Sequence, residues 1–71
     1  MHRLRICEPG DVDRFCEFLR AVQVSVEAIE GAIVTASLPG ARSDLHERRG
    51  IGGYVTTWNA LNPASFVEIA E

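Results

Sequence analysis

The sequence predicts an α+β fold in which the elements follow one another as strand, helix, strand, strand, helix, strand. Four short segments alternate apolar and polar residues with a period of two, two longer segments show helical spacing, and glycine or proline marks the junctions between them. In a chain of 71 residues this order fits one architecture. We therefore expect one ferredoxin-like βαββαβ domain over residues 1–71, a four-stranded antiparallel sheet with two helices on one face.

The first strand and helix are predicted from alternation followed by helical spacing. Leu4 and Ile6 alternate with polar residues over 2–7, and a Pro-Gly pair ends this strand. Asp11 is placed to cap the next helix, residues 12–22, because a carboxylate accepts hydrogen bonds from the free amides of a first turn. The apolar residues at helical spacing predict the buried face: Val12, Phe15, Leu19 and Val22.

A hairpin is predicted next. Residues 24–28 and 33–38 alternate, and Gly31 supplies the positive φ of a tight turn between them. If the alternation is regular, the core-facing residues of the earlier strand are Val24, Val26 and Ala28.

The second helix is predicted with less support from its residues. Either Ser43 or Asp44 can cap it, with Asp44 and Glu47 at capping-box spacing, and Pro63 ends it. Three glycines inside its first half could fray or kink residues 44–53, so the sequence leaves the continuity of this helix open. The predicted buried face is Leu45, Ile51, Tyr54, Val55, Trp58 and Leu61, and the glycines are Gly50, Gly52 and Gly53.

The last strand follows that proline. Val67 and Ile69 alternate with Phe66 and Glu68, and this segment has to pair with the first strand to complete the sheet.

Composition excludes several classes of function. Ten acids against seven bases, all of them arginine, give a net charge of −3, the opposite of the basic face that nucleic-acid binding requires. No apolar run approaches the roughly 20 residues of a membrane span, and the first residues lack the apolar core of a signal peptide. We expect a cytoplasmic protein.

The cysteines and histidines do not form a recognised motif. Cys7 and Cys16 are separated by eight residues, and His2 and His46 lie far from them along the chain. The simplest interpretation makes Cys16 a small apolar core residue and Cys7 a thiol at the end of a strand. A thiol or metal protein remains a weaker hypothesis, and no cofactor is expected.

A basic cluster precedes and enters the second helix. Its members are Arg42, His46, Arg48 and Arg49, and glycines follow at 50, 52 and 53. Glycine-rich backbone at a helix start can approach an anion, but the spacing of a phosphate-binding loop is missing. Pairing of the arginines with Asp44 and Glu47 is the simpler interpretation.

No arrangement of residues predicts catalysis. The chain has no Ser/His/Asp order, nucleophile elbow or pair of carboxylates that can be placed in a buried site, so we expect no enzyme.

The sheet face opposite the helices is the leading candidate for function. Alternation places on it a mixture of charged and apolar residues, with Arg5 able to pair with Glu68: Arg3, Arg5, Cys7, Glu27, Ile33, Thr35, Ser37, Phe66 and Glu68. Such a surface is typical of an interface, although scattered exposure without a role is the alternative. We expect a homodimer or a cytoplasmic protein partner, with an interface at Arg5, Ile33, Thr35, Phe66 and Glu68.

Two resemblances accompany this interpretation. The Pro9-Gly10-Asp11-Val12 segment resembles the first strand-to-helix loop of ACT domains, which are ferredoxin-like modules that bind amino acids through a glycine in that loop. The resemblance implies an alternative function, amino-acid sensing, with a ligand loop at Glu8, Gly10 and Asp11.

The second resemblance covers most of the chain. Ser37-Leu38-Pro39-Gly40, the pattern from Tyr54 to Trp58, and Asn62-Pro63-Ala64 before the last strand are similar to small actinobacterial proteins of this length. That family has no established activity, so the likeness implies the fold and no site residues.

Overall fold

The computed structural model describes residues 1–70 and has the predicted order of elements. Short 3₁₀ turns precede the first helix and follow the second. The elements are β1 (His2–Ile6), η1 (Pro9–Asp11), α1 (Val12–Ala21), β2 (Ser25–Glu30), β3 (Ile33–Ser37), α2 (Asp44–Leu61), η2 (Pro63–Ser65) and β4 (Val67–Ile69).

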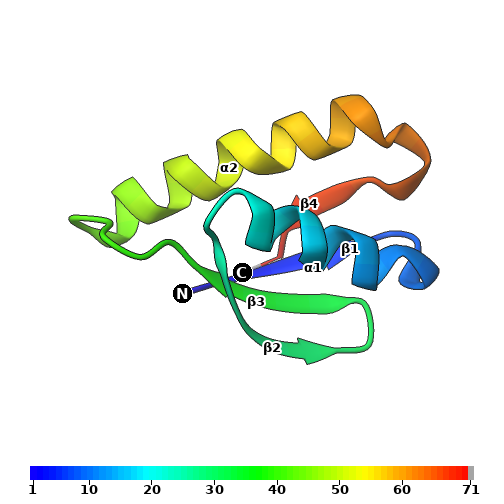
Figure 1. Ribbon diagram of the computed structural model, residues 1–71, viewed down its shortest axis with the longest axis horizontal. Helices are drawn as coiled ribbons and strands as arrows, with labels where there is room; N and C mark the ends of the chain where they lie inside the picture. The colour runs from blue at the N-terminus through cyan, green and yellow to red at the C-terminus, as the bar shows by residue number, and fades with distance from the viewer. Residues whose placement is uncertain (71) are drawn as a thin grey trace.

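The strands form one antiparallel sheet in the order β2-β3-β1-β4, so the first and last strands pair as predicted. Both helices lie on one side of this sheet (Figure 1). Along β1 the residues are alternately buried and exposed, with Leu4 and Ile6 under the helices and Arg3 and Arg5 on the other face. The chain therefore has the ferredoxin-like α+β fold.

The predicted alternation fails within β2 because the strand contains a β-bulge. Val26 lies opposite Ala36, whereas Ala28 lies opposite Thr35, so Glu27 is an extra residue between them. A single extra residue exchanges the two faces of the strand beyond it. The prediction that Ala28 faces the core is therefore wrong. Ile29 takes the helix-side face instead and remains 46% exposed.

A glycine of positive φ makes the turn that follows β2, and another makes the turn that follows β3. Gly31, with a φ of 60°, makes the predicted turn between β2 and β3. After β3, Gly40 has a φ of 82° behind Pro39, and the Ala41 amide donates to the Leu38 carbonyl at 3.2 Å. Proline followed by a glycine of positive φ is the arrangement of a type II turn.

Helix α2 is continuous from Asp44 to Leu61, which answers the question that its glycines left open. Ser43 is the N-cap, its Oγ accepting from the His46 amide at 3.0 Å. The capping box suggested for Asp44 and Glu47 does not form. Glu47 Oε2 instead accepts from the Leu38 amide at 3.1 Å, which ties the first turns of the helix to the end of β3.

The glycines of α2 differ in their surroundings. A Cβ at Gly50 would lie 2.5 Å from Leu38 Cδ2, so this glycine allows close packing of the helix on the chain beyond β3. A Cβ at Gly52 or Gly53 would meet no atom within 4 Å.

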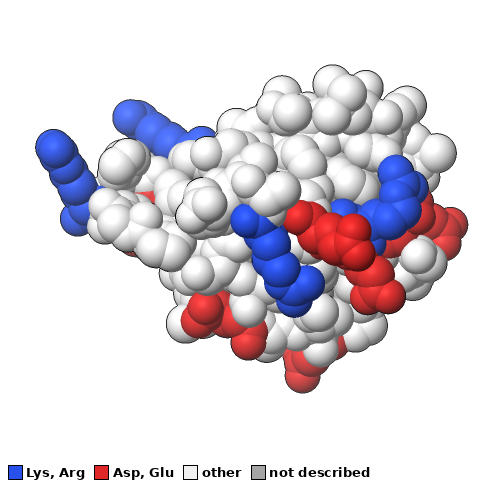
Figure 2. Space-filling view, in the orientation of Figure 1, with Lys and Arg blue, Asp and Glu red and all other residues white. Residues whose placement is uncertain are grey.

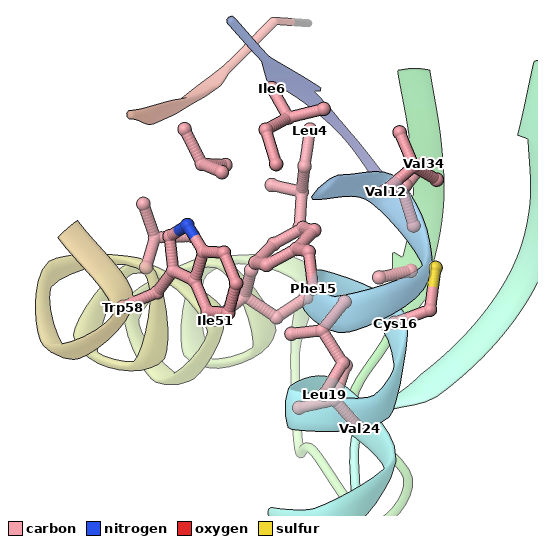
Figure 3. Packing of buried hydrophobic residues seen from close by; sticks show 13 residues of the cluster. Leu4, Ile6, Val12, Phe15, Cys16, Leu19, Val24, Val34, Ile51 and Trp58 are labelled. Atoms are coloured by element: carbon pink, nitrogen blue, oxygen red, sulfur yellow. The ribbon is translucent and has the colours of Figure 1, made fainter. Parts of the chain in front are cut away.

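The core lies between the helices and the sheet. Aromatic residues fill the part of it where α1 packs against α2. The rings of Phe15 and Trp58 meet edge to face at 5.1 Å between centroids (Figure 3). The indole Nε1 of Trp58 donates to the buried Ser65 carbonyl at 2.7 Å. Leu45 and Leu61, which were predicted to be buried, are exposed at the two ends of α2. Ile51, Val55 and Trp58 form the buried face of this helix.

A side-chain amide joins α2 to the outer edge of the sheet. Asn59 Nδ2 donates to the Val67 carbonyl at 2.9 Å, and the Val67 amide donates to Asn59 Oδ1 at 2.8 Å. Asn59 thus satisfies both polar backbone groups of one residue of an edge strand, as a neighbouring strand would.

Two further findings concern the cysteines and membrane insertion. Cys16 is buried and Cys7 is exposed, as predicted. Burial raises the pKa of the Cys16 thiol and so favours its protonated form. Among residues 1–70, no helix combines the length and apolar character needed to cross a membrane.

Candidate functional site

The polar groups of the loop from Glu8 to Asp11 are used within the chain. Glu8 Oε1 accepts from the Gly10 amide at 3.1 Å. The Asp11 carboxylate makes no helix-capping hydrogen bond, contrary to the sequence prediction, although Asp11 is at the N-cap position of α1. It accepts instead from Ser65 and, at 3.1 Å, from Arg14.

These contacts change the acidity of Asp11. The hydrogen bond from Ser65 and, with a smaller effect, the neighbouring Arg14 guanidinium hold the pKa of Asp11 below its ordinary value. The carboxylate therefore joins η1 to η2 as an ionised acceptor. Its oxygens are committed to structural contacts.

The open face of the sheet carries rows of side chains across the strands. The register aligns Glu30 with Ile33, Ile33 with Arg5, and Arg5 with Glu68. Arg5 Nη1 donates to Glu68 Oε1 at 3.0 Å, so the predicted pair forms. The next row aligns Ala28, Thr35 and Arg3. This face is mixed in charge and has apolar residues within it.

Apolar residues of this face lie at its centre and at one end. Ile33 and Thr35, on a central strand, are half-buried even though no helix covers them. Phe66 is 50% exposed and precedes β4, where its carbonyl accepts from the Cys7 amide at 2.9 Å. All five residues of the predicted interface therefore lie on or beside one surface: Arg5, Ile33, Thr35, Phe66 and Glu68.

A second cluster lies where β1 meets the first turn of α2. Asp44 and Glu47 are three residues apart and so share one side of the helix. His2 Nε2 lies 3.4 Å from Asp44 Oδ1 and 3.4 Å from Glu47 Oε1. The Met1 amino group is 2.5 Å from Glu47 Oε1 and 4.0 Å from Asp44 Oδ1. We call His2, Asp44 and Glu47 the His2 cluster.

The environments of the three side chains differ. The His2 side chain is 1% exposed and that of Glu47 12%, whereas that of Asp44 is 80% exposed. Hydrogen bonds from the Met1 amino group and from the Leu38 amide lower the pKa of Glu47, and the charge of His2 adds a smaller effect. The cluster therefore combines a buried imidazole with an ionised carboxylate, and its third side chain is open to solvent.

The contacts of Asp44 and Glu47 leave the basic cluster without its expected partners. Among residues 1–70, neither carboxylate forms an ion pair with Arg42, Arg48 or Arg49, so the predicted self-pairing is wrong. Basic side chains project from the end of the molecule where α2 begins (Figure 2). They border an open hollow of about 540 Å³, lined by Arg42, Ser43, Leu45, His46 and Arg49.

The outer surface of α2 beyond this hollow has no charge. From Gly50 to Val67 the chain contains no charged residue, and Figure 2 shows the corresponding uncharged surface along the helix. Thr56 and Thr57 turn their hydroxyls back to the Gly52 and Gly53 carbonyls, at 2.9 and 3.2 Å. This surface could have been predicted from the run of uncharged residues in the sequence.

A signal for the His2 cluster was also present in the sequence. His2 is two residues before Leu4, so the alternation that buries Leu4 and Ile6 also turns His2 toward the helices. Alternation alone does not predict the position of α2. The first turn of this helix brings the carboxylates of Asp44 and Glu47 to the start of β1.

Comparisons with protein-family models, with curated proteins and with solved structures give no match.

Proposed function

We propose that the protein acts by association and not by catalysis, and that it forms a homodimer through the open face of its sheet. The observation that carries this proposal is the arrangement of layers. Both helices are on one side, so within the described chain neither helix covers Ile33 or Phe66 on the other side.

The distribution of charges on this face supports a second copy of the chain as its binding partner. Arg3 and Arg5 lie on a central strand, and Glu30 and Glu68 lie on the two edge strands. The surface therefore presents both the cations and the anions that a copy of itself would need.

The size of the face sets the expected affinity. The four strands have 5, 6, 5 and 3 residues. With strands about 4.8 Å apart and a rise of about 3.3 Å per residue, the sheet makes a surface of at most roughly 20 by 17 Å. This is smaller than the roughly 800 Å² per partner of a standard interface, so a weak dimer is expected, with a Kd in the micromolar range or above.

Sedimentation equilibrium between about 1 µM and about 1 mM tests the proposal, because this range brackets the expected Kd. Phe66→Glu places a charge at the edge of the contact and is expected to raise the dimer Kd at least tenfold. Leu45→Glu is the matched control, since Leu45 is an apolar residue of similar exposure on the helix layer. It is expected to leave the Kd unchanged.

The uncharged surface of α2 is the competing site of association. Ala60→Glu introduces a charge there at an exposed position. A dimer that is lost with Ala60→Glu and kept with Phe66→Glu would contradict the sheet-face interface, while a wild-type chain that stays monomeric over the whole range would contradict the homodimer.

A further inference from the structure

Two of the distances between donor atoms in the His2 cluster match those in the ligand shell of a small metal ion. A tetrahedral ion with bonds of about 2.0–2.1 Å holds its ligand atoms about 3.3–3.4 Å apart. The distances from His2 Nε2 to Asp44 Oδ1 and to Glu47 Oε1 are both 3.4 Å. All three donor atoms lie within 4.8 Å of one another.

The types of donor atom narrow the choice of ion. One imidazole nitrogen and two carboxylate oxygens suit zinc, which takes nitrogen and oxygen ligands in a small coordination shell. Magnesium and calcium instead take six or more oxygen ligands, so they fit this set poorly.

The surrounding structure holds two of the three donors in place. The His2 ring is fixed by its burial at the start of β1. Glu47 Oε2 is held by the Leu38 amide at 3.1 Å, which orients the carboxylate and directs Oε1 toward His2. Asp44 is exposed, and its side of the cluster gives an ion access from solvent.

The contacts of the chain terminus show that this position attracts positive charge. The Met1 amino group lies against Glu47 Oε1 and near Asp44 Oδ1. A metal ion would compete with the protonated amine for these oxygens.

We propose that His2, Asp44 and Glu47 form a binding site for a divalent transition-metal ion, and that zinc is the ion this site fits best. The site joins β1 to the first turn of α2, a region where the helix buries no side chain in the core. Binding is therefore expected to stabilise the start of α2, in addition to any association of the domain.

Isothermal titration calorimetry, in which ZnCl₂ is added to the full chain, tests the proposal. We expect one zinc ion per chain and no heat of binding with MgCl₂. Asp44→Asn and His2→Gln should each weaken zinc binding at least tenfold, because each removes a ligand. Asp44→Asn is the more informative variant, since its exposed side chain can be changed without disturbing the core.

Matched controls separate this site from other donors in the chain. Asp13→Asn makes the same chemical change in the first turn of α1 and is expected to leave zinc binding unchanged. Cys7→Ser and His46→Gln remove the exposed thiol and the exposed histidine and should also have no effect. Circular dichroism confirms that each variant is folded.

Cobalt provides a readout of geometry. Co²⁺ in a tetrahedral shell absorbs visible light much more strongly than octahedral Co²⁺, so intense visible bands in the wild type that are lost in Asp44→Asn would support the site. Absence of zinc binding would overturn the proposal. So would zinc binding that survives Asp44→Asn and His2→Gln but is lost with Cys7→Ser or His46→Gln.

Discussion

The two halves of α2 are held to the rest of the molecule by different interactions. From Ile51 onward the helix buries Ile51, Val55 and Trp58 in the core. From Asp44 to Gly50 it buries no side chain fully, and polar contacts of Glu47 and the close approach of Gly50 to Leu38 position it. The two halves of this helix therefore have different roles. The later half stabilises the fold, whereas the earlier half carries Asp44 and Glu47 of the His2 cluster and most of the basic cluster.

Trp58→Ala tests the role of the later half of α2 and is expected to have the largest effect on stability. The indole contacts Phe15 and donates to the Ser65 carbonyl, so its removal leaves a cavity and an unpaired acceptor. We expect a loss of about 3 to 5 kcal/mol in the free energy of unfolding, which is a large share of the stability of a small domain. Urea denaturation followed by circular dichroism measures it. A variant with near wild-type stability would show that the later half of α2 is not the main support of the core.

A smaller loss is expected for Asn59→Ala. This substitution removes both hydrogen bonds to Val67 and should reduce the free energy of unfolding by about 1 to 3 kcal/mol. Thr56→Ala, one turn earlier on the exposed surface, loses only a hydrogen bond back to Gly52 and should change stability by less than about 0.5 kcal/mol. Equal effects of the two substitutions in the same denaturation assay would rule out a special role for the Asn59 amide.

The only stabilising substitution concerns a glycine, and its expected effect is small. Gly52→Ala has open space for its Cβ and should raise the free energy of unfolding by about 0.5 to 1 kcal/mol, since alanine loses less conformational entropy in a helix. Gly50→Ala should gain less or lose stability, because the new Cβ forces Leu38 to move. Thermal unfolding of the two variants side by side measures the difference. A larger gain for Gly50→Ala would mean that the packing against Leu38 has little importance.

The order of elements and most of the core followed from local patterns in the sequence. Leu4 and Ile6 alternate, Phe15 and Leu19 recur at helical spacing, and these patterns determine which face is buried. The ion pair of Arg5 and Glu68 was also predictable, because antiparallel pairing of the first and last strands brings them together.

At Asp11 and at the glycines of α2, tertiary contacts outweigh local preferences. Asp11 is placed to cap α1, but the Ser65 hydroxyl competes successfully for its carboxylate. The bulge at Glu27 adds one residue without any glycine or proline to mark it. The glycines of α2 are tolerated because packing of Ile51, Val55 and Trp58 holds the helix together across them.

The candidate sites were only partly predictable for the same reason. The open sheet face depends on alternation and strand order, which could be read from the sequence except in β2, where the bulge exchanges the two faces of the strand. The His2 cluster depends on how α2 lies across the start of β1, and that position is set by contacts between residues far apart in the chain, such as Glu47 with Leu38 and His2 with Asp44.

The β-bulge in β2 has a consequence for how this chain behaves at high concentration. β2 is one edge of the sheet, and its bulge and acidic residues make it a poor template for another strand. The other edge, β4, is only three residues long, and Asn59 already occupies the backbone groups of Val67. With both edges obstructed, we expect further copies to add poorly strand to strand, and we expect the chain to resist growth into fibres.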